Sequence, residues 1–365
     1  MESPFASDAV ARAEKDRRLE GWKTAPRDDY KGIIPSNMLW GGRKGAGDSP
    51  PPRFRHAVRG RDADSLYYMI DLHGSSGLFH YRISERKETR LFHHAQFRSH
   101  GMAFDPDREV LVISSENRDG TAYLAVYDKE GNSKGTITGG DAMDTAPSCS
   151  MRDKGVVWFQ SAGIARDRQS GHAVALGPSV VNRLSYSEGK LDTVLEDRAF
   201  DFLAPREDGR GVLYYIRRPY ERSGVEAAGS IAKDAFMFPY RMLKAIFGYL
   251  NFFSTIYGRE PLRSAGGPAH DPLERDLGAL WLHGRMIQAA NVSREESRGL
   301  VPASWQLRRR DRTGEDALVA EHVVSFDLCE DGSLFYSNGF EVFHILRDNP
   351  TSRKHDGIIE AVSAA

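Results

Sequence analysis

The chain has 365 residues, 40% of them hydrophobic, and a formal net charge of −1 at pH 7. This length admits one large β domain or two ordinary domains, and the near-neutral charge excludes the basic excess of a general nucleic-acid binder. Cys149 and Cys329 are too few for a disulfide framework and are not spaced as a metal-binding pair. We therefore expect a reducing compartment, no metal and no other cofactor.

The first 52 residues are expected to form an arm and a linker. Residues 7–20 are charged and weakly helical, and residues 41–52 have the glycine and proline density of a loop. Between them, residues 32–40 are a candidate strand that would close a ring of sheets. The chain does not open on a basic segment followed by an apolar one, so the sequence predicts no secretory signal and a cytoplasmic location.

Short apolar runs then recur along the chain, beginning at Leu66, Val110, Val156, Val212 and Leu334. The first four runs start 44, 46 and 56 residues apart. Each run is apolar at nearly every position, as expected of a strand that is covered on both faces. Repeats of about 40–50 residues, each one small sheet, are typical of a β-propeller. We expect Val112, Trp158 and Tyr214 to lie on the middle strands of such sheets.

The last run shows the local geometry most clearly. Residues 333–337 and 340–345 are two apolar segments, and Asn338-Gly339 stands between them. Asn-Gly in this position is a strong hairpin signal, because both turn residues of the favoured turn have positive φ.

One stretch carries a fuller blade pattern. Residues 144–150 read Asp-Thr-Ala-Pro-Ser-Cys-Ser, and after a turn residues 154–161 form an apolar strand that ends in Ser. This stretch resembles the TolB-like and WD-type propeller blade, and weaker copies begin at Phe104, Phe202 and Phe326. The resemblance covers roughly residues 54–345 without the insertion described below. It implies an all-β fold, a single β-propeller, and no particular activity.

The blades are predicted to occupy residues 53–220 and 278–347, on either side of an insertion at 221–277 and before a tail at 348–365. The predicted count is six if residues 278–282, Gly-Ala-Leu-Trp-Leu, belong to a blade of their own, and five otherwise.

The insertion contains a predicted helix between Pro239 and Gly258, since proline favours the first helical turn and glycine the position after the last. Its polar residues form one stripe, namely Arg241, Lys244, Gly248, Asn251 and Thr255. The remaining apolar arc is wider than a surface helix needs, so we expect the helix to be covered on more than one side.

Three interpretations of this helix stay open: a structural cap, a contact with a partner protein or a second copy, and attachment to a membrane surface. Interfacial helices usually carry more than the two basic residues, Arg241 and Lys244, that are found here. The candidate partner-binding residues are Leu243, Phe247, Leu250, Phe253 and Tyr257.

The sequence contains no catalytic motif of the nucleophile-elbow, zinc-protease or phosphate-loop type. In a propeller, chemistry would be placed at the start of each innermost strand, where it faces the central channel. The candidates for these places are His100, Asp144, Asp201 and His322. His and Asp together can bind a metal or act as acid and base, but an Asp here more often accepts backbone hydrogen bonds and fixes the blade.

We therefore predict a non-enzymatic bacterial β-propeller that acts as an interaction module or scaffold. Its partner would be another protein or a second copy, bound through the insertion helix, and no nucleic acid is expected. The alternative is a propeller enzyme, a hydrolase or lyase, that uses the His and Asp groups at the central channel.

Overall fold

The computed structural model describes residues 3–8, 11, 15, 53–72, 75–95, 97–166, 173–186, 188–221, 279–282, 285–288, 299–346, 349–354, 359 and 361–364. The chain divides into two compact units: Met1–Ala57 with Asp64–Phe97, and Val58–Ala63 with Arg98–Ala365. The predicted strand at 32–40 and the predicted helix between Pro239 and Gly258 lie outside the described residues. No helix among the described residues is long and apolar enough to cross a membrane.

The first unit contains sheet I, an antiparallel sheet whose strands follow chain order: β1 (Arg53–Arg59), β2 (Ser65–Leu72), β3 (Ser75–Arg82) and β4 (Lys87–Ala95). Residues 4–8 are helical, and Phe5 packs against the buried side chains of Tyr68 and Phe79. Glu88 on β4 accepts hydrogen bonds from Ser3 Oγ at 2.5 Å and from the Phe5 amide at 3.0 Å. The N-terminal residues are thus fixed to sheet I by both apolar and polar contacts.

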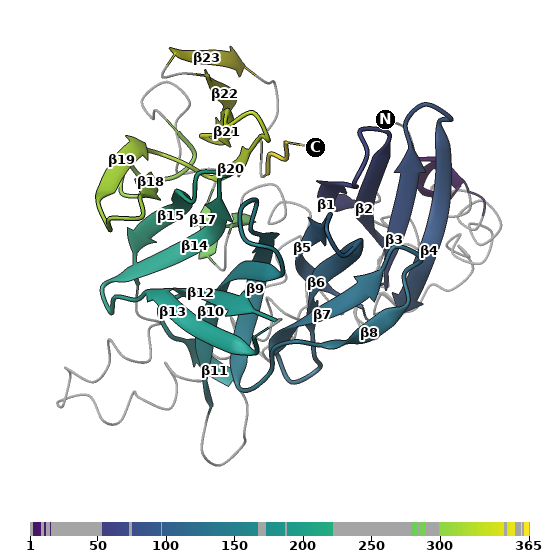
Figure 1. The fold of residues 1–365 in the computed structure, drawn as a ribbon, viewed down its shortest axis with the longest axis horizontal. Coiled ribbons are helices and arrows are strands. Elements are labelled where there is room, and N and C mark those ends of the chain that lie inside the picture. Colours follow the sequence, from purple (N-terminus) through teal and green to yellow (C-terminus); the bar gives the residue numbers. More distant parts are fainter. Residues whose placement is uncertain are drawn as a thin grey trace, which may run out of the picture. The chain divides into compact units, whose positions relative to one another are not determined.

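The second unit contains four further groups of four antiparallel strands, again taken in chain order (Figure 1). Sheet II comprises β5 (Ser99–Asp105), β6 (Val110–Glu116), β7 (Ala122–Asp128) and β8 (Ser133–Thr136). Sheet III comprises β9 (Ala142–Cys149), β10 (Val156–Arg166), β12 (Val180–Ser185) and β13 (Lys190–Leu195), and β11 (Ala173–Leu176) pairs with the far end of β10. A single parallel bridge between Ala122 and Met143 joins sheets II and III.

Sheet IV comprises β14 (Phe200–Glu207), β15 (Leu213–Pro219), β18 (Gln306–Arg310) and β19 (Asp316–Ala320). Because β15 pairs directly with β18, the predicted insertion lies within the connection between the second and third strands of this one sheet. Sheet V comprises β20 (Ser325–Leu328), β21 (Leu334–Ser337), β22 (Glu341–Leu346) and β23 (Asn349–Lys354). Its last strand extends beyond the predicted blade boundary at residue 347.

In the described residues, sheets I, IV and V are four-stranded, sheets II and III are joined into one nine-stranded sheet, and the prediction of six blades is not confirmed. The segment expected to begin a sixth blade forms β16 (Ala279–Leu282), and among the described residues β16 pairs only with β17 (Arg285–Gln288). Local apolar character predicted a strand at this place correctly, but it did not show how many partners the strand would have.

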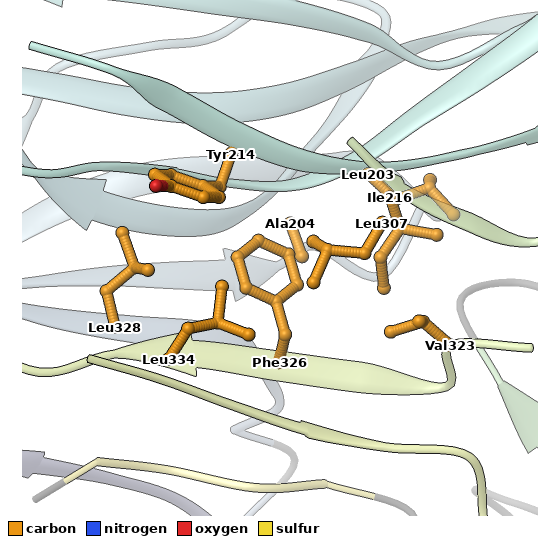
Figure 2. Close-up of a cluster of buried hydrophobic side chains, with 9 residues drawn as sticks. All are labelled: Leu203, Ala204, Tyr214, Ile216, Leu307, Val323, Phe326, Leu328 and Leu334. Carbon is orange, nitrogen blue, oxygen red and sulfur yellow. The ribbon is translucent and has the colours of Figure 1, made fainter. Parts of the chain in front are cut away.

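Apolar cores lie between consecutive sheets of the second unit. On β15, Tyr214 and Ile216 belong to a core shared with sheet V, whereas Leu213 and Tyr215 belong to one shared with sheet III. Figure 2 shows the first of these cores, in which Phe326 of β20 packs among side chains of sheet IV. Successive residues of a strand point to opposite faces, so a strand that supplies two cores is apolar at every position.

The same alternation occurs on β10. Val156 and Trp158 pack toward sheet IV, and Val157 and Phe159 pack toward sheet II. The predicted middle strands are thus confirmed, since Val112, Trp158 and Tyr214 lie on β6, β10 and β15, which have hydrogen-bonded neighbours on both sides, and are 0%, 6% and 8% exposed.

The first strands of sheets II, III and IV each contain a β-bulge at a similar place. Gly101, Ala146 and Ala204 occupy these bulges with φ of 148°, 50° and 50°. The bulges also contact each other: a Cβ on Gly101 would lie 2.6 Å from Pro147 Cδ, and Ser148 Oγ donates a hydrogen bond of 2.7 Å to the Pro205 carbonyl. The bulges therefore fix the distance between neighbouring first strands.

Candidate functional site

The structure places the four channel candidates at corresponding points of sheets II to V. His100 lies on β5, Asp144 on β9 and Asp201 on β14, each early in the first strand of its sheet, and His322 lies shortly before β20. Their hydrogen-bond partners decide what these side chains can do.

Asp144 is a buried acceptor. Ser161 Oγ on β10 donates a hydrogen bond of 2.6 Å to Asp144 Oδ1, and Ser114 Oγ on β6 donates one of 2.6 Å to the Asp144 carbonyl. Burial raises the pKa of Asp144, and hydrogen bonds from Ser161 and Thr138 oppose that shift. The residue thereby joins β9 to β10 and, through its backbone, to sheet II.

Asp201 forms a buried ion pair. Arg218 Nε on β15 donates a hydrogen bond of 2.8 Å to Asp201 Oδ2, and each side chain is 5% exposed. The backbone amide of Ser179 donates to the other carboxylate oxygen at 2.9 Å. The Arg218 guanidinium also lies over the Trp305 ring, 4.6 Å from its centroid. These contacts connect the first two strands of sheet IV with the residue that precedes its third strand.

The two histidines are also bound by neighbours. His100 Nε2 lies 2.7 Å from Oε2 of Glu116, whose side chain is 4% exposed. His322 has φ of 60°, and its Nδ1 donates a hydrogen bond of 2.8 Å to the Val301 carbonyl. His100 thus connects β5 to the end of β6, and His322 fixes the turn that leads into β20.

Among the described residues, no three His, Cys, Asp or Glu side chains are arranged so that they could hold a metal ion. A hollow of about 250 Å³ lies between sheets III and IV, and its lining includes Phe200, Phe202, Tyr215 and Arg217. None of the four candidates lines this hollow, even though Asp201 stands between two of its residues in the sequence. The partner-binding candidates, Leu243, Phe247, Leu250, Phe253 and Tyr257, lie outside the described residues.

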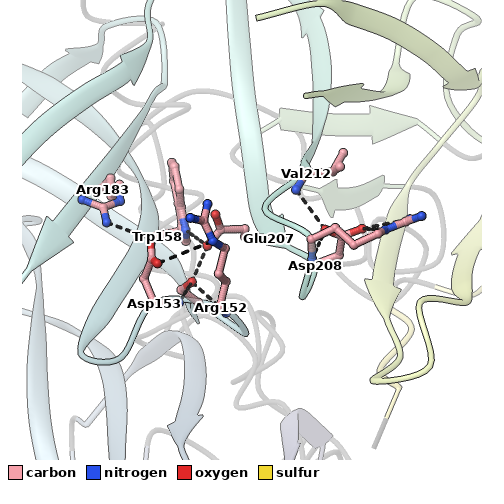
Figure 3. Close-up of polar contacts among 9 residues, drawn as sticks. Arg152, Asp153, Trp158, Arg183, Glu207, Asp208 and Val212 are labelled. Carbon is pink, nitrogen blue, oxygen red and sulfur yellow. Dashed lines mark hydrogen bonds and ion pairs between the residues drawn. The ribbon is translucent and has the colours of Figure 1, made fainter. Parts of the chain in front are cut away.

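Sequence reasoning missed the acidic residues between the sheets. Glu207, at the end of β14, is 6% exposed and accepts a hydrogen bond of 2.9 Å from Trp158 Nε1 on β10 (Figure 3). Ser150 Oγ donates to the same carboxylate oxygen. Glu207 stands next to Asp208 and Gly209 in the sequence, so it reads as part of an ordinary polar turn. No local signal shows that a neighbouring sheet covers it.

A second missed residue is Asp327 on β20. Its Oδ1 accepts a hydrogen bond of 3.1 Å from Arg206 Nε on β14, and its Oδ2 accepts one of 2.9 Å from the backbone amide of Ala364. The sequence pattern identified Phe326 and Asp327 as the opening of a blade copy, but the partners of the carboxylate are distant in the sequence.

No family model and no curated protein sequence matches this chain. Similar solved structures include TolB from Acinetobacter baumannii, at 9% identity over 84% of this chain and 55% of that one, with a TM-score of 0.46. A prolyl endopeptidase structure matches at 6% identity over 84% of this chain and 36% of that one, with a TM-score of 0.42. Oligogalacturonate lyase from Vibrio parahaemolyticus matches at 8% identity over 81% and 63%, with a TM-score of 0.37.

This chain spans about half the length of the TolB structure. The assignment to the all-β class rests on consecutive antiparallel sheets that share apolar cores. The predicted all-β fold is confirmed for the described residues, most of which lie in strands.

Proposed function

We propose that this protein is a non-enzymatic β-propeller module that binds another protein or a second copy of itself. The observation that carries the proposal is the set of hydrogen bonds made by the four channel candidates. Each is bonded to a neighbour that fixes a strand or turn: His100 to Glu116, Asp144 to Ser161, Asp201 to Arg218 and His322 to the Val301 carbonyl. These bonds support a structural role for the residues most suited to acid–base chemistry.

The proposed contact surface is the apolar strip of the insertion, formed by Leu243, Phe247, Leu250, Phe253 and Tyr257. Its support is the sequence pattern: residues at three- and four-residue spacing share one face of a helix, and a strip of large apolar side chains there suits a helix-in-groove contact.

Asp144→Asn and His100→Gln test the proposal in cells, because both substitutions remove a titratable group while keeping a similar shape. We expect cells carrying either variant to match the wild type in growth, whereas cells that lack the gene show the loss-of-function phenotype. Immunoblotting confirms that the variants accumulate to normal levels. A variant that accumulates normally but behaves like the deletion would contradict the proposal and favour a propeller hydrolase or lyase.

A further inference from the structure

The C-terminal segment of the chain lies along β20, the first strand of sheet V (Figure 1). The backbone amide of Val362 donates a hydrogen bond of 2.7 Å to Ser325 Oγ, and the amide of Ala364 donates one of 2.9 Å to Asp327 Oδ2. Upstream, the Ile359 amide donates to the Gly339 carbonyl at 2.8 Å. The segment is therefore held by specific polar contacts at three points.

The spacing of these contacts shows that the segment is extended. Both side-chain contacts join residues 37 positions apart, so the segment advances two residues for every two residues of β20 and runs in the same direction. Val362 and Ala364 are half-buried, whereas Ala361 and Ser363 are exposed. This alternation is the two-residue period of a strand with one covered face.

The acceptors belong to the sheet and are held in place independently of the segment. Ser325 and Asp327 are two residues apart on β20, while the alternate residues Phe326 and Leu328 are buried in the core shared with sheet IV. The Arg206 guanidinium binds Oδ1 of Asp327, which leaves Oδ2 to accept the Ala364 amide and the Ser363 hydroxyl at 3.4 Å. A hydrogen bond to a fixed carboxylate is stronger than one between neutral groups.

The C-terminal segment contacts β20 mainly through its backbone. Its two shorter bonds to β20 come from backbone amides, which every non-proline residue has, and its two half-buried side chains, Val362 and Ala364, are small. Any extended peptide with small side chains at alternate positions can make these two amide contacts. A segment held by a few partly exposed bonds also opens at low free energy compared with the core of the sheet.

We propose that Ser325 and Asp327 form an acceptor site for an extended peptide with small alternate side chains, which the chain's own residues 361–364 occupy until a partner's peptide displaces them. This inference deepens the proposed function, on which it rests, by adding a second binding surface and the class of partner that it takes. The tethered segment has a high effective concentration, so a free peptide competes well only when the tethered one is weakened.

The test uses full-length protein and a fluorescent peptide with the sequence of residues 357–365, Gly-Ile-Ile-Glu-Ala-Val-Ser-Ala-Ala. A donor-deleted variant, Val362→Pro with Ala364→Pro, lacks the two amides that bind β20. The matched control, Ala361→Pro with Ser363→Pro, carries the same number of prolines one residue earlier. It keeps both amides and loses only the longer contact of the Ser363 hydroxyl with Asp327 Oδ2. Fluorescence anisotropy then measures binding of the peptide to each protein.

We expect the donor-deleted variant to bind the peptide at least tenfold more tightly than the wild type, and the control to match the wild type. Adding Ser325→Ala or Asp327→Ala to the donor-deleted variant should return binding to the wild-type level. Because Asp327→Ala also removes the contact with Arg206, the Ser325→Ala variant decides the result if the other fails to fold. Equal binding by the donor-deleted and wild-type proteins would overturn the inference.

Amide hydrogen exchange of the wild type provides an independent readout. The amides of Val362 and Ala364 should exchange more slowly than that of Ala361. Exchange of all three at the rate of a free peptide would show that the segment is not docked, and the inference would fail. Complex formation through the apolar strip of the insertion would be unaffected by that result, so the two proposals fail separately.

Discussion

At the scale of single residues, two buried carboxylates and one that is 19% exposed hold the sheets together. Asp201 binds Arg218 within sheet IV, Glu207 joins sheet IV to sheet III, and Asp327 joins sheet V to sheet IV. A buried carboxylate is costly unless its oxygens accept hydrogen bonds, and each of these accepts at least two. These hydrogen bonds therefore restrict how the sheets can pack. Apolar contacts alone restrict the packing less strictly.

The ion pair of Asp201 leads to the first prediction. Asp201→Asn should lower the free energy of unfolding by about 3–5 kcal/mol, because it removes the negative charge that faces a buried guanidinium. Asp192→Asn is the matched control: it breaks the Lys190–Asp192 pair, whose side chains are 62% and 38% exposed, and should cost less than about 1 kcal/mol. Urea unfolding of both variants makes the measurement. Equal losses would show that the buried pair has no special role.

Trp158 packs in an apolar core and also donates a buried hydrogen bond. Trp158→Ala should cost about 3–5 kcal/mol, because the substitution leaves a cavity between sheets III and IV and removes a hydrogen bond to Glu207. Leu191→Ala, at a side chain that is 56% exposed, should change stability by less than about 0.5 kcal/mol. Chemical denaturation measures both variants. The proposed packing would be wrong if Trp158→Ala lowered the free energy of unfolding by less than about 1 kcal/mol.

Asp144 leads to a prediction about pH. Burial raises the pKa of Asp144 in the folded state above the ordinary value of 3.8 that it has in the unfolded chain. At a pH between the unfolded and the folded pKa, the folded state therefore binds more protons than the unfolded state. The contribution of Asp144 to stability therefore falls as pH rises through its folded pKa. Asp144→Asn does not ionise and keeps an acceptor for Ser161.

The stability of Asp144→Asn relative to the wild type should therefore increase from about pH 3 to about pH 7. Thermal unfolding of both proteins across this range makes the measurement. A relative stability that decreases with pH would mean that the aspartate is stabilised in its ionised form.

At the scale of elements, the first strands of sheets II, III and IV are each shaped by a bulge. Ala146 and Ala204 adopt positive φ, a conformation that non-glycine residues rarely take, and a proline follows each of them. The Ala204 amide donates a hydrogen bond of 2.7 Å to Gln160 Oε1 on β10. A side chain of sheet III thus fixes Ala204, the strained residue of sheet IV. The bulges therefore form contacts between neighbouring sheets.

Gly101 tests the role of these bulges. Gly101→Ala should destabilise the protein by about 3 kcal/mol, because the new Cβ would meet Pro147 and the backbone of Ala146 within 2.9 Å and because φ is 148°. At Gly139 a Cβ would meet nothing within 4 Å, so Gly139→Ala should be nearly neutral. Differential scanning calorimetry compares the two. If they melted at the same temperature, the first strands would not be in close contact.

The elements also show what a sequence can predict. The middle strands β6, β10 and β15 were identifiable because burial on both faces makes nearly every residue apolar. The strand β18, which reads Gln-Leu-Arg-Arg-Arg, gives no such signal: only Leu307 is buried, and the arginine side chains lie at partly exposed or exposed positions. Its pairing with β15 spans a long insertion, so neither the pattern nor the spacing could locate it.

For the candidate site, the sequence indicated the strands that carry the residues but not their hydrogen-bond partners. His100, Asp144 and Asp201, which the repeat pattern selected because each precedes an apolar strand by a similar interval, lie on the first strands of their sheets. Their partners were not predictable, because Arg218 and Ser161 are separated from Asp201 and Asp144 by whole turns, and many polar residues lie at comparable distances in the sequence.

At the scale of the whole molecule, the fold is a series of similar sheets, and the middle strands β10 and β15 each supply residues to the cores on both of their sides. Such a scaffold supports binding and catalysis alike, so function must be argued from sites and not from the fold. In this chain the polar residues of the first strands maintain the sheets, and the proposed binding surfaces are the insertion strip and the face of β20.

The central claim, that the protein is an interaction module, is tested most directly by Leu250→Asp with Phe253→Asp. In the predicted helix these residues would lie one turn apart on the apolar strip, and charges there would oppose burial against a partner. Size-exclusion chromatography of the native complex, with the melting temperature of the same samples, makes the measurement. We predict that the double variant loses the complex and keeps the wild-type melting temperature; a monomeric wild type, together with a variant destabilised by several kcal/mol, would show that the strip is an internal cap and would contradict the account.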